Sequence, residues 1–357
     1  MDRGTLDVYE QRARDWQRLR PPRRREDARA FAARVPGAGV RADLGCGPGS
    51  HTPDLGLPVV AVDAAFAMLE LARREVPHAW PVRADLEALP FRDRSLAGAW
   101  ARASYLHVPR ARLPMALAHL HRALEVGAPF DGTVKVGDHD GPMPDDEFPG
   151  RVFSRWEPHA FADVLGGAGF DVEATDVDVE WIRFRCRRAR TLPDTVGPGL
   201  RVLVCGLNPS LYAADVGIGF ARPGNRFWPA ALDAGLVTKD RDPFHAYVHD
   251  RVGMTDLVKR AAAAASELTA GEYRAGAARV ERLVRWHEPG AVVFVGLAGW
   301  RAAVDRRAVA GWQPGGFGGR PAYVMPSTSG LNARTPPSAL AAHLRTVRDA
   351  VGPATRA

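Results

Sequence analysis

The sequence is poor in cysteine and has no long apolar run. Its only cysteines, Cys46, Cys186 and Cys205, show neither a CxxC spacing nor a Cys/His spacing typical of a metal site. Three thiolates are too few for a four-cysteine iron–sulfur cluster. No apolar stretch approaches the roughly 20 residues needed to span a membrane, and the charged N-terminal segment lacks the apolar core of a signal peptide. We therefore expect a cytoplasmic protein without a metal site or a membrane partner.

Positive charge is concentrated in the second half of the chain. Residues 201–357 carry 20 Lys+Arg against 12 Asp+Glu, a net charge of +8, whereas residues 1–200 carry 28 against 29, a net charge of −1. A polyanion such as DNA would bind the basic half by neutralising phosphates and releasing counterions. Many basic domains bind no nucleic acid, so the motifs must decide.

Strand-like and helix-like segments alternate twice along the chain. The first alternation runs from Val40 to Phe184, and a second one begins at RVLVCG, residues 201–206. Such alternation predicts parallel sheets with helices on both faces. TLPDTVGPG, residues 191–199, is rich in proline and glycine and is the natural linker. We expect two three-layer α/β/α domains, a Rossmann-like domain over residues 1–190 and a second domain with a parallel central sheet over residues 200–357.

A glycine-rich loop, DLGCGPG at residues 43–49, directly follows the first predicted strand. Its glycines let the backbone approach a ligand closely. The loop differs from the dinucleotide fingerprint, because Pro48 removes an amide donor and Ser50 occupies the place of the third glycine. A nucleoside without phosphates fits this loop better than a dinucleotide.

Two aspartates extend this pattern. Asp63 ends the predicted strand VVAVD, where a carboxylate can accept hydrogen bonds from both ribose hydroxyls. Asp85, in ADLEALPF, is predicted to end a third strand and to face an adenine edge. Either aspartate alone has an ordinary explanation as a strand-end carboxylate, and His107 in ASYLHVPR has one as a packed or exposed histidine.

This order of segments resembles the class I S-adenosylmethionine-dependent methyltransferases over roughly residues 5–190. The resemblance implies S-adenosylmethionine as the cofactor of the first domain, and it leaves the methyl acceptor unknown. The residues implied to bind it are Asp43, Gly45 and Gly47 at the methionine end, Asp63 at the ribose and Asp85 at the adenine amine.

The second domain carries three separated motifs: GLNPS at 206–210, FARPGNRFW at 220–228 and MPSTSGLNAR at 325–334, with MTDLVKR at 254–260 between the last two. Asn208 is expected on a loop at the carboxyl end of a strand, where open parallel sheets bind ligands. A carboxamide there can orient water but has no useful basicity. The bond to be cut must therefore break largely by itself, as an N-glycosidic bond can through an oxocarbenium-like state.

These motifs, in this order and spacing, resemble the mismatch-specific uracil/thymine-DNA glycosylases. The resemblance implies that Asn208 holds the attacking water and that Phe220 stacks on a flipped base. It places the segment around Leu331 in the gap that the base leaves. Further residues implied to bind the base are Gly206, Leu207, Ser210 and Asn225, and those implied to contact the duplex are Ser329, Gly330, Leu331 and Arg334.

Elementary physical chemistry favours the same roles. Extruding a base costs a few kcal/mol, least for a mispaired base, and an apolar wedge such as Leu331 prevents it from re-stacking. Phe220 offers a π-face worth roughly 1–3 kcal/mol to the extruded pyrimidine. In isolation Phe220 could be a core residue, Asn208 a turn residue and Asn225 a helix cap. Only their joint occurrence favours the functional interpretation.

The motifs also depart from the family pattern. Ser210 replaces the usual glycine and narrows the space near the base, which disfavours thymine more than uracil. Ile218-Gly219 replaces a histidine pair common in the family. Asn208 takes the place of the aspartate found in the efficient uracil glycosylases, so turnover should be slow.

We therefore expect a DNA repair enzyme that removes uracil mispaired with guanine, with thymine or damaged pyrimidines as further substrates. Its partner is double-stranded DNA carrying a mismatched or damaged base, at the nucleoid. The glycosylase domain needs no cofactor and is monofunctional, since no lysine lies in the three motif loops. The alternative is a methyltransferase whose C-terminal domain only binds DNA or senses lesions. The sequence carries no signal for the oligomeric state.

Overall fold

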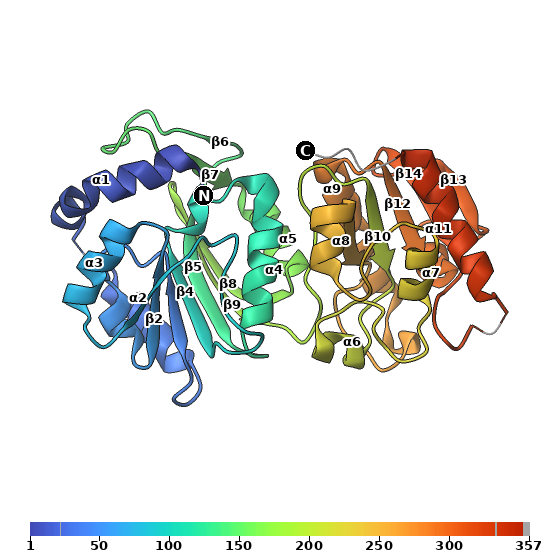
Figure 1. The fold of residues 1–357 in the computed structure, drawn as a ribbon, viewed down its shortest axis with the longest axis horizontal. Coiled ribbons are helices and arrows are strands. Elements are labelled where there is room, and N and C mark those ends of the chain that lie inside the picture. The colour runs from blue at the N-terminus through green and yellow to red at the C-terminus, as the bar shows by residue number, and fades with distance from the viewer. Residues whose placement is uncertain (22, 333, 353–357) are drawn as a thin grey trace. The chain divides into compact units, whose positions relative to one another are not determined.

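The computed structural model describes residues 1–21, 23–332 and 334–352. The chain divides into two compact units. The first comprises Met1–Gly166 with Phe170–Ala189, and the second comprises Gly167–Gly169 with Arg190–Ala357. Residues 191–199, predicted as a linker, thus lie in the second unit. Figure 1 shows the first unit in blue to green and the second in yellow to red.

The first unit is built on a sheet in which β3, β2, β1, β4 and β5 are parallel neighbours in that order. The strand β9 joins β5 antiparallel, and β8 pairs antiparallel with β9. A short β7 runs parallel to the end of β5 and carries β6 at its edge. These strands are β1 (Arg41–Leu44), β2 (Val59–Asp63), β3 (Trp80–Arg83), β4 (Gly98–Arg102), β5 (Pro129–Val136), β6 (Asp140–Gly141), β7 (Phe153–Trp156), β8 (Phe170–Val177) and β9 (Trp181–Arg188).

Helices cover this sheet because its central strands are apolar on both faces. Residues 59–62 of β2 are all buried, as expected for a parallel strand between two helical layers. Phe31 of α2 and Leu69 of α3 pack into one cluster with Val59 and Trp100. The helices are α1 (Arg3–Leu19), α2 (Arg25–Arg34), α3 (Phe66–Glu75), α4 (Leu113–Ala123) and α5 (Pro158–Gly167), with short 3₁₀ turns η1 (Thr52–Leu55), η2 (Tyr105–His107) and η3 (Arg110–Arg112).

The second unit has a five-stranded sheet in the order β11-β10-β12-β14-β13. All pairs are parallel except β13 with β14. Its strands are β10 (Val202–Gly206), β11 (Val252–Asp256), β12 (Ala291–Val295), β13 (Gly311–Phe317) and β14 (Arg320–Met325). Its helices are α6 (Leu211–Val216), α7 (Phe227–Asp233), α8 (Pro243–Asp250), α9 (Ala270–His287), α10 (Leu297–Ala303) and α11 (Pro337–Val351), with the 3₁₀ turn η4 (Ala265–Glu267).

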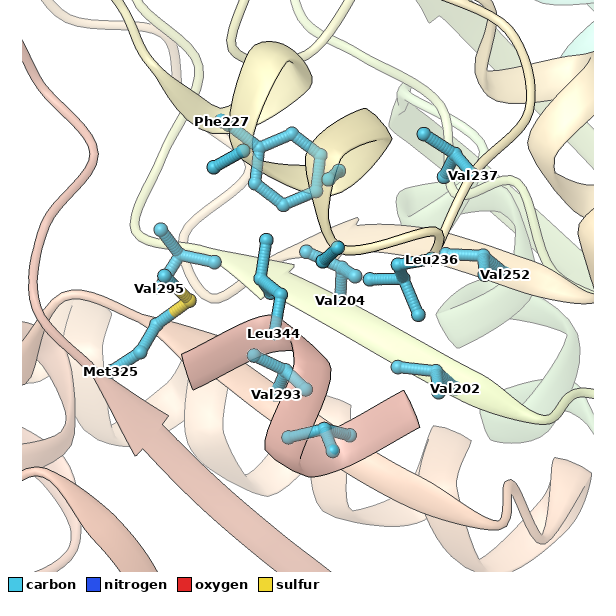
Figure 2. Close-up of a cluster of buried hydrophobic side chains, with 14 of the residues drawn as sticks. Val202, Val204, Phe227, Leu236, Val237, Val252, Val293, Val295, Met325 and Leu344 are labelled. Atoms are coloured by element: carbon cyan, nitrogen blue, oxygen red, sulfur yellow. The ribbon is translucent and has the colours of Figure 1, made fainter. Parts of the chain in front are cut away.

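The core of the second unit lies on both faces of this sheet, because successive side chains of a strand point to opposite sides. Val202 and Val204 pack with Phe227 of α7 and Leu344 of α11, as Figure 2 shows. The alternate residues of β10 pack on the other face with α9 and α10. Both units are thus α/β with helices against the sheet, and the predicted fold class is confirmed.

The structure also bears on the membrane prediction. Across residues 1–21, 23–332 and 334–352, every helix is too short or too polar to cross a bilayer.

Candidate functional site

A cavity of about 430 Å³ opens at the carboxyl ends of the strands in the first unit. Four of the five predicted cofactor residues line it: Asp43, Gly45, Gly47 and Asp63. A cavity of this size is in the range of small-molecule sites. The structure therefore brings these four residues to one concave site.

The fifth predicted cofactor residue, Asp85, lies differently. The strand β3 ends at Arg83, so Asp85 follows the strand by two residues instead of ending it. One carboxylate oxygen lies 2.5 Å from the Met1 α-amino nitrogen, and the other accepts a hydrogen bond from the Glu87 N–H at 3.0 Å. The neighbours Ala84 and Leu86 line the cavity, which leaves the Asp85 side chain at its margin.

The glycine loop packs closely against the segment that follows β4. Gly45 has a φ of 72° and Gly47 a φ of 54°, both in the left-handed region. A Cβ at residue 45 would lie 2.3 Å from the Cβ of Ser104, which no side chain can tolerate. The N–H of Gly45 donates to Val62 O at 2.8 Å, so the loop is fastened to the neighbouring strand. Glycine is therefore required where the loop passes the start of the segment after β4.

The two aspartates of this cavity hold protons unusually tightly. Burial raises the pKa of Asp43 to about 7, with a further increase from Asp63 and a decrease from the Thr52 hydroxyl that donates to it at 2.6 Å. Burial also raises the pKa of Asp63 to about 6, although the N–H groups of Gly47 and Ala65 donate to it. A cationic ligand would favour the charged form of both groups.

His107, which the sequence left as a packed or exposed histidine, is packed, and it belongs to a polar network, not predicted from the sequence, that lines or borders the same cavity. The Nδ1–H of His107 donates to Val152 O at 2.8 Å, and its Nε2 accepts from the Tyr9 hydroxyl at 2.7 Å. Arg151 donates to the Tyr9 oxygen at 2.9 Å. Burial lowers the pKa of His107 to about 4, so the imidazole is neutral near pH 7. The spacing of Tyr9 and Trp16 on α1 was a signal that this helix faces the site.

In the second unit the motif loops begin at one edge of the sheet. Gly206 ends β10, Asp256 ends β11 and Met325 ends β14, and the carboxyl ends of parallel strands share an edge. With about 4.8 Å between neighbouring strands, the loops after β10 and β14 start about 10 Å apart, separated by β12. In Figure 1, α6 and the loop leading into α11 lie at the same lower edge of this unit.

Asn208 is held in one orientation. Its side-chain Nδ2 donates to Pro209 O at 3.0 Å and to Arg260 O at 3.2 Å. Two carbonyl acceptors fix which end of the carboxamide is nitrogen. Its Oδ1 receives no hydrogen bond from the part of the chain that the structure describes. The half-buried carboxamide therefore presents an oriented acceptor at this edge.

Phe220 adopts a backbone conformation that is rare for a bulky residue, with a φ of 58°. Its ring stacks on that of Phe227, with centroids 4.3 Å apart and planes at 24°. A Cβ built on Gly206 would lie 3.3 Å from Phe220 Cζ, so the ring reaches the first motif loop. Strain of this kind persists where the surroundings impose it, often at functional sites.

Three other predicted base-binding residues have structural contacts. The Asn225 side-chain oxygen accepts from the Phe227 N–H at 2.9 Å, at the start of α7. The Ser210 hydroxyl accepts from the Ala213 N–H at 3.1 Å and caps α6. Leu207 packs partly into the core. The Ser210 contact is that of an N-cap, whereas Asn225 lies one residue before the N-cap of α7, Arg226.

The predicted wedge loop is anchored at its base and exposed at its tip. Arg226 donates to the backbone oxygens of Thr335 and Asn332 at 2.6 Å and of Ser329 at 3.2 Å. A Cβ on Gly330 would lie 2.9 Å from Gly224 O, so this loop passes close to the second motif. Leu331 is 88% exposed. Arg334 is exposed as well.

Asp256 is a second residue that the sequence analysis missed, although it lies in the MTDLVKR segment. It pairs in register with Gly206, and a Cβ on Gly206 would lie 2.4 Å from its Oδ1. Its carboxyl group is buried and accepts no hydrogen bond from the described residues. Burial raises its pKa to about 6. With Phe220 it lines a small pocket of about 20 Å³.

The lysine of MTDLVKR is engaged in an ion pair. The Lys259 Nζ lies 2.9 Å from Asp194 Oδ1, and Arg279 and Thr255 also donate to this carboxylate. Burial alone would raise the pKa of Asp194, but Arg279 and Lys259 outweigh burial and lower it. Lys259 is thus bound to a charged partner within the fold.

Comparisons with known proteins agree with both predicted families. Residues 193–349 match the family model of the uracil DNA glycosylase superfamily, and residues 42–127 match that of a methyltransferase domain. Both families are enzyme families.

Three solved structures are similar to part of the chain. An S-adenosylmethionine-dependent methyltransferase from Methanosarcina mazei is 14% identical, with 43% of this chain and 95% of that chain covered and a TM-score of 0.40. One from Mesorhizobium loti is 19% identical, covering 44% and 96%, with a TM-score of 0.37. The 1,6-didemethyltoxoflavin-N1-methyltransferase from Burkholderia thailandensis is 19% identical, covering 52% and 88%, with a TM-score of 0.44.

Proposed function

Because the chain joins a methyltransferase domain to a domain of the uracil DNA glycosylase superfamily, we propose that it is a monofunctional DNA glycosylase. It hydrolyses the N-glycosidic bond of uracil mispaired with guanine, and it acts more weakly on thymine or damaged pyrimidines. The glycosylase belongs to residues 200–357. Residues 1–190 form an S-adenosylmethionine-dependent methyltransferase-like domain, and residues 191–199 connect the two in sequence.

The observation that carries this proposal is the orientation of Asn208. Two backbone carbonyls hold its Nδ2, so its Oδ1 is left to accept a hydrogen bond from water. This hydrogen bond directs a lone pair of the water oxygen at the sugar carbon. The carboxamide takes no proton, so the glycosidic bond breaks before water adds fully, and the added water releases its proton to solvent. Electrostatic stabilisation of the transition state then matters more than basicity, and without a carboxylate beside the sugar turnover is slow.

Phe220 and Asp256 complete the base-binding side of the site. A flipped pyrimidine stacks on Phe220, whose ring is already aligned by Phe227. Asp256, buried beside Gly206, meets the base in its neutral form and donates a hydrogen bond to a carbonyl oxygen as the base leaves with the bonding electrons. In its charged form it would repel that leaving anion.

Leu331 and Arg334 hold the duplex open. An exposed leucine on an anchored loop gains nothing in the free protein, whereas it fills the vacancy in a duplex after a base is extruded. Arg334 then contacts a phosphate or the opposing guanine. Lys259 stays paired with Asp194, so no amine attacks the sugar and the strand is not nicked by β-elimination.

The first unit fits S-adenosylmethionine on its own geometry. Gly45 and Gly47 line the cavity without side chains, and the buried carboxyl group of Asp43 and the partly buried one of Asp63 can meet a cation or hydroxyl donors. Asp43 would hold the methionine end, Asp63 the ribose and Asp85 the adenine amine. The cofactor, when bound, supplies an activated methyl group. The residues of the chain bind and orient it and exclude water.

The catalytic assignment is tested with a duplex that carries one G·U pair. Asn208→Ala should abolish cleavage at the uracil while retaining binding to the duplex. Gln313→Ala, which removes a carboxamide from the edge strand β13, is the matched control and should cleave like the wild type. Equal cleavage by Asn208→Ala and the wild type would refute the role of Asn208.

One observation favours the alternative function. The pocket beside Phe220 has about 20 Å³ of space, enough for roughly one water molecule, so a base enters only if this pocket widens. A C-terminal domain that senses lesions without cleaving them would need no such widening. In that case, the protein would bind the G·U duplex more tightly than a G·C duplex and leave both intact.

A further inference from the structure

The cavity of the first unit also contains a cationic row, formed by Arg102, Thr133 and Arg183. These residues have no part in the proposed binding of the cofactor. Arg102 ends β4, and the register pairs it with Thr133 of β5. Thr133 pairs in turn with Arg183 of β9. Side chains of paired residues lie on the same face of a sheet, and all three residues line the cavity. Two guanidinium groups thus flank a hydroxyl at the carboxyl edge of the central strands.

The charge of Arg102 is poorly balanced. Its Nη1 is buried and has no hydrogen-bond partner within residues 1–21, 23–332 and 334–352. Its closest carboxylate, Asp27, lies 3.9 Å away and is shared with Arg24 at 3.7 Å. Burial lowers the pKa of Arg102, and although Asp27 and Glu26 raise it, Arg24 and Arg183 lower it further. A half-buried guanidinium whose Nη1 has no hydrogen-bond partner favours an anion in the cavity.

The neighbouring cations are not equivalent. Arg183 already pairs with Asp176 at 3.1 Å and with Asp178. Arg24 lies at the exposed mouth, with a φ of 57° that turns the chain into α2. Arg102 is therefore the main recognition group, and the other two strengthen the local positive potential.

The position of the row separates it from the cofactor residues. Asp43 and Asp63 lie on β1 and β2, whereas the row crosses β4, β5 and β9. The two regions meet where Gly45 touches Ser104, two residues beyond Arg102. A second ligand on the row would therefore lie beside the methionine end of the cofactor, where a methyl acceptor must be.

We propose that Arg102, assisted by Thr133, Arg183 and Arg24, binds the oxyanion of the methyl acceptor, a small molecule carrying a carboxylate or a phosphate. The cavity of about 430 Å³ suits a small molecule, and Trp16 and Trp181 in its lining suit one with a planar apolar part. This inference rests on the proposed S-adenosylmethionine site.

Isothermal titration of the full chain tests it. Three probes of similar shape, benzoate, phenyl phosphate and neutral benzamide, are titrated with and without saturating S-adenosylhomocysteine. At least one anion should bind at least tenfold more tightly than benzamide, and the tighter anion identifies the group. Binding of benzamide as tight as that of both anions overturns the proposal.

Variants then locate the site. Arg102→Gln should weaken binding of the anion at least tenfold while leaving affinity for S-adenosylhomocysteine within about twofold. Arg102→Lys, which keeps the charge but loses the two-pronged geometry, should be intermediate. Arg73→Gln, an exposed arginine of α3 outside the cavity, should bind like the wild type.

Two results would contradict the assignment. Unchanged anion binding by Arg102→Gln would remove Arg102 from the site. An equal loss of anion and S-adenosylhomocysteine would assign Arg102 to the carboxylate of the cofactor itself. Failure of the wild type to bind S-adenosylhomocysteine would refute the cofactor site separately. The titrations of the anions without S-adenosylhomocysteine would still show whether the cationic row binds an anion. The comparison of the three probes uses only the wild type, so it does not depend on whether a variant folds.

Discussion

At the scale of single residues, the two candidate sites depend on buried polar groups without full partners. Asp43, Asp63 and Asp256 are each aspartates whose pKa burial raises to about 6 or 7. Asn208 has one end of its carboxamide fixed and the other available. Such groups destabilise the free protein and are kept where a ligand satisfies them.

The first residue-scale prediction concerns Asp256. Below its pKa of about 6 the carboxyl group is neutral and donates to the leaving base, and above it the carboxylate repels that base. The single-turnover rate of uracil excision should therefore fall as pH rises through about 6, by roughly tenfold per pH unit. Asp256→Asn keeps a donor at every pH and should show a flat profile. Parallel pH–rate profiles of the wild type and Asp256→Asn would rule out this role of Asp256.

The second residue-scale prediction concerns the cofactor. Asp43, with a pKa of about 7, is protonated in the ligand-free protein at lower pH, and a ligand with an ammonium group favours the carboxylate. Binding below pH 7 must then release a proton. The affinity for S-adenosylhomocysteine should therefore rise with pH and level off above about 7, with a slope of at most about tenfold per pH unit for this group.

Titration calorimetry in two buffers of different ionisation enthalpy would measure the released proton. Asp43→Asn should bind more weakly, and proton release near pH 7 should disappear. Proton uptake by the wild type on binding S-adenosylhomocysteine below pH 7 would contradict the predicted proton release.

At the scale of elements, the sequence predicted the strands that are apolar and end in glycine or a small polar residue. β10 lies where RVLVCG, residues 201–206, predicted a strand, and β12 and β14 form at apolar runs of the same kind, AVVFVG and AYVMP. β13 was missed because Gly311–Phe317 contains proline and glycine, which indicate turns in a sequence. β11 was missed because only two of its five residues are large and apolar. Its pairing with β10 makes it a strand.

The same contrast holds for the sites. Asn208, Phe220 and Leu331 were predicted as site residues because they belong to local motifs. Asp256 and the His107–Tyr9–Arg151 network were not, because their burial and their partners depend on contacts between distant segments. Local sequence cannot reveal which polar side chain loses its solvent on folding.

The prediction at this scale concerns the loop from residue 325 to 336. Leu331 is 88% exposed, so Leu331→Ala should change the free energy of unfolding by no more than about 0.5 kcal/mol. It should nevertheless slow excision of uracil from a G·U duplex, by roughly tenfold or more, because the extruded base re-stacks. Excision from a single strand should be unaffected, since no vacancy forms there.

The matched control is Val309→Ala, another exposed apolar residue of the same unit, at 69% exposure. It should leave both rates unchanged. Equal excision rates for Leu331→Ala and the wild type on the duplex would remove the wedge role from this loop.

At the scale of the whole molecule, two α/β units carry two different kinds of ligand site at corresponding places. In each unit the candidate site lies at the carboxyl ends of parallel strands, where loops leave the sheet. The basic half of the chain is the one with the proposed DNA site. The first unit is near neutral overall, and five of its arginines, Arg20, Arg23, Arg24, Arg102 and Arg183, line its cavity.

The most direct measurement of the central claim is a single-turnover assay with a duplex labelled on the uracil strand of one G·U pair. With enzyme in excess, the wild type should leave a site that alkali cleaves at the uracil, while the strand stays whole without alkali. A strand that remains intact after alkali would contradict the claim that this chain excises uracil.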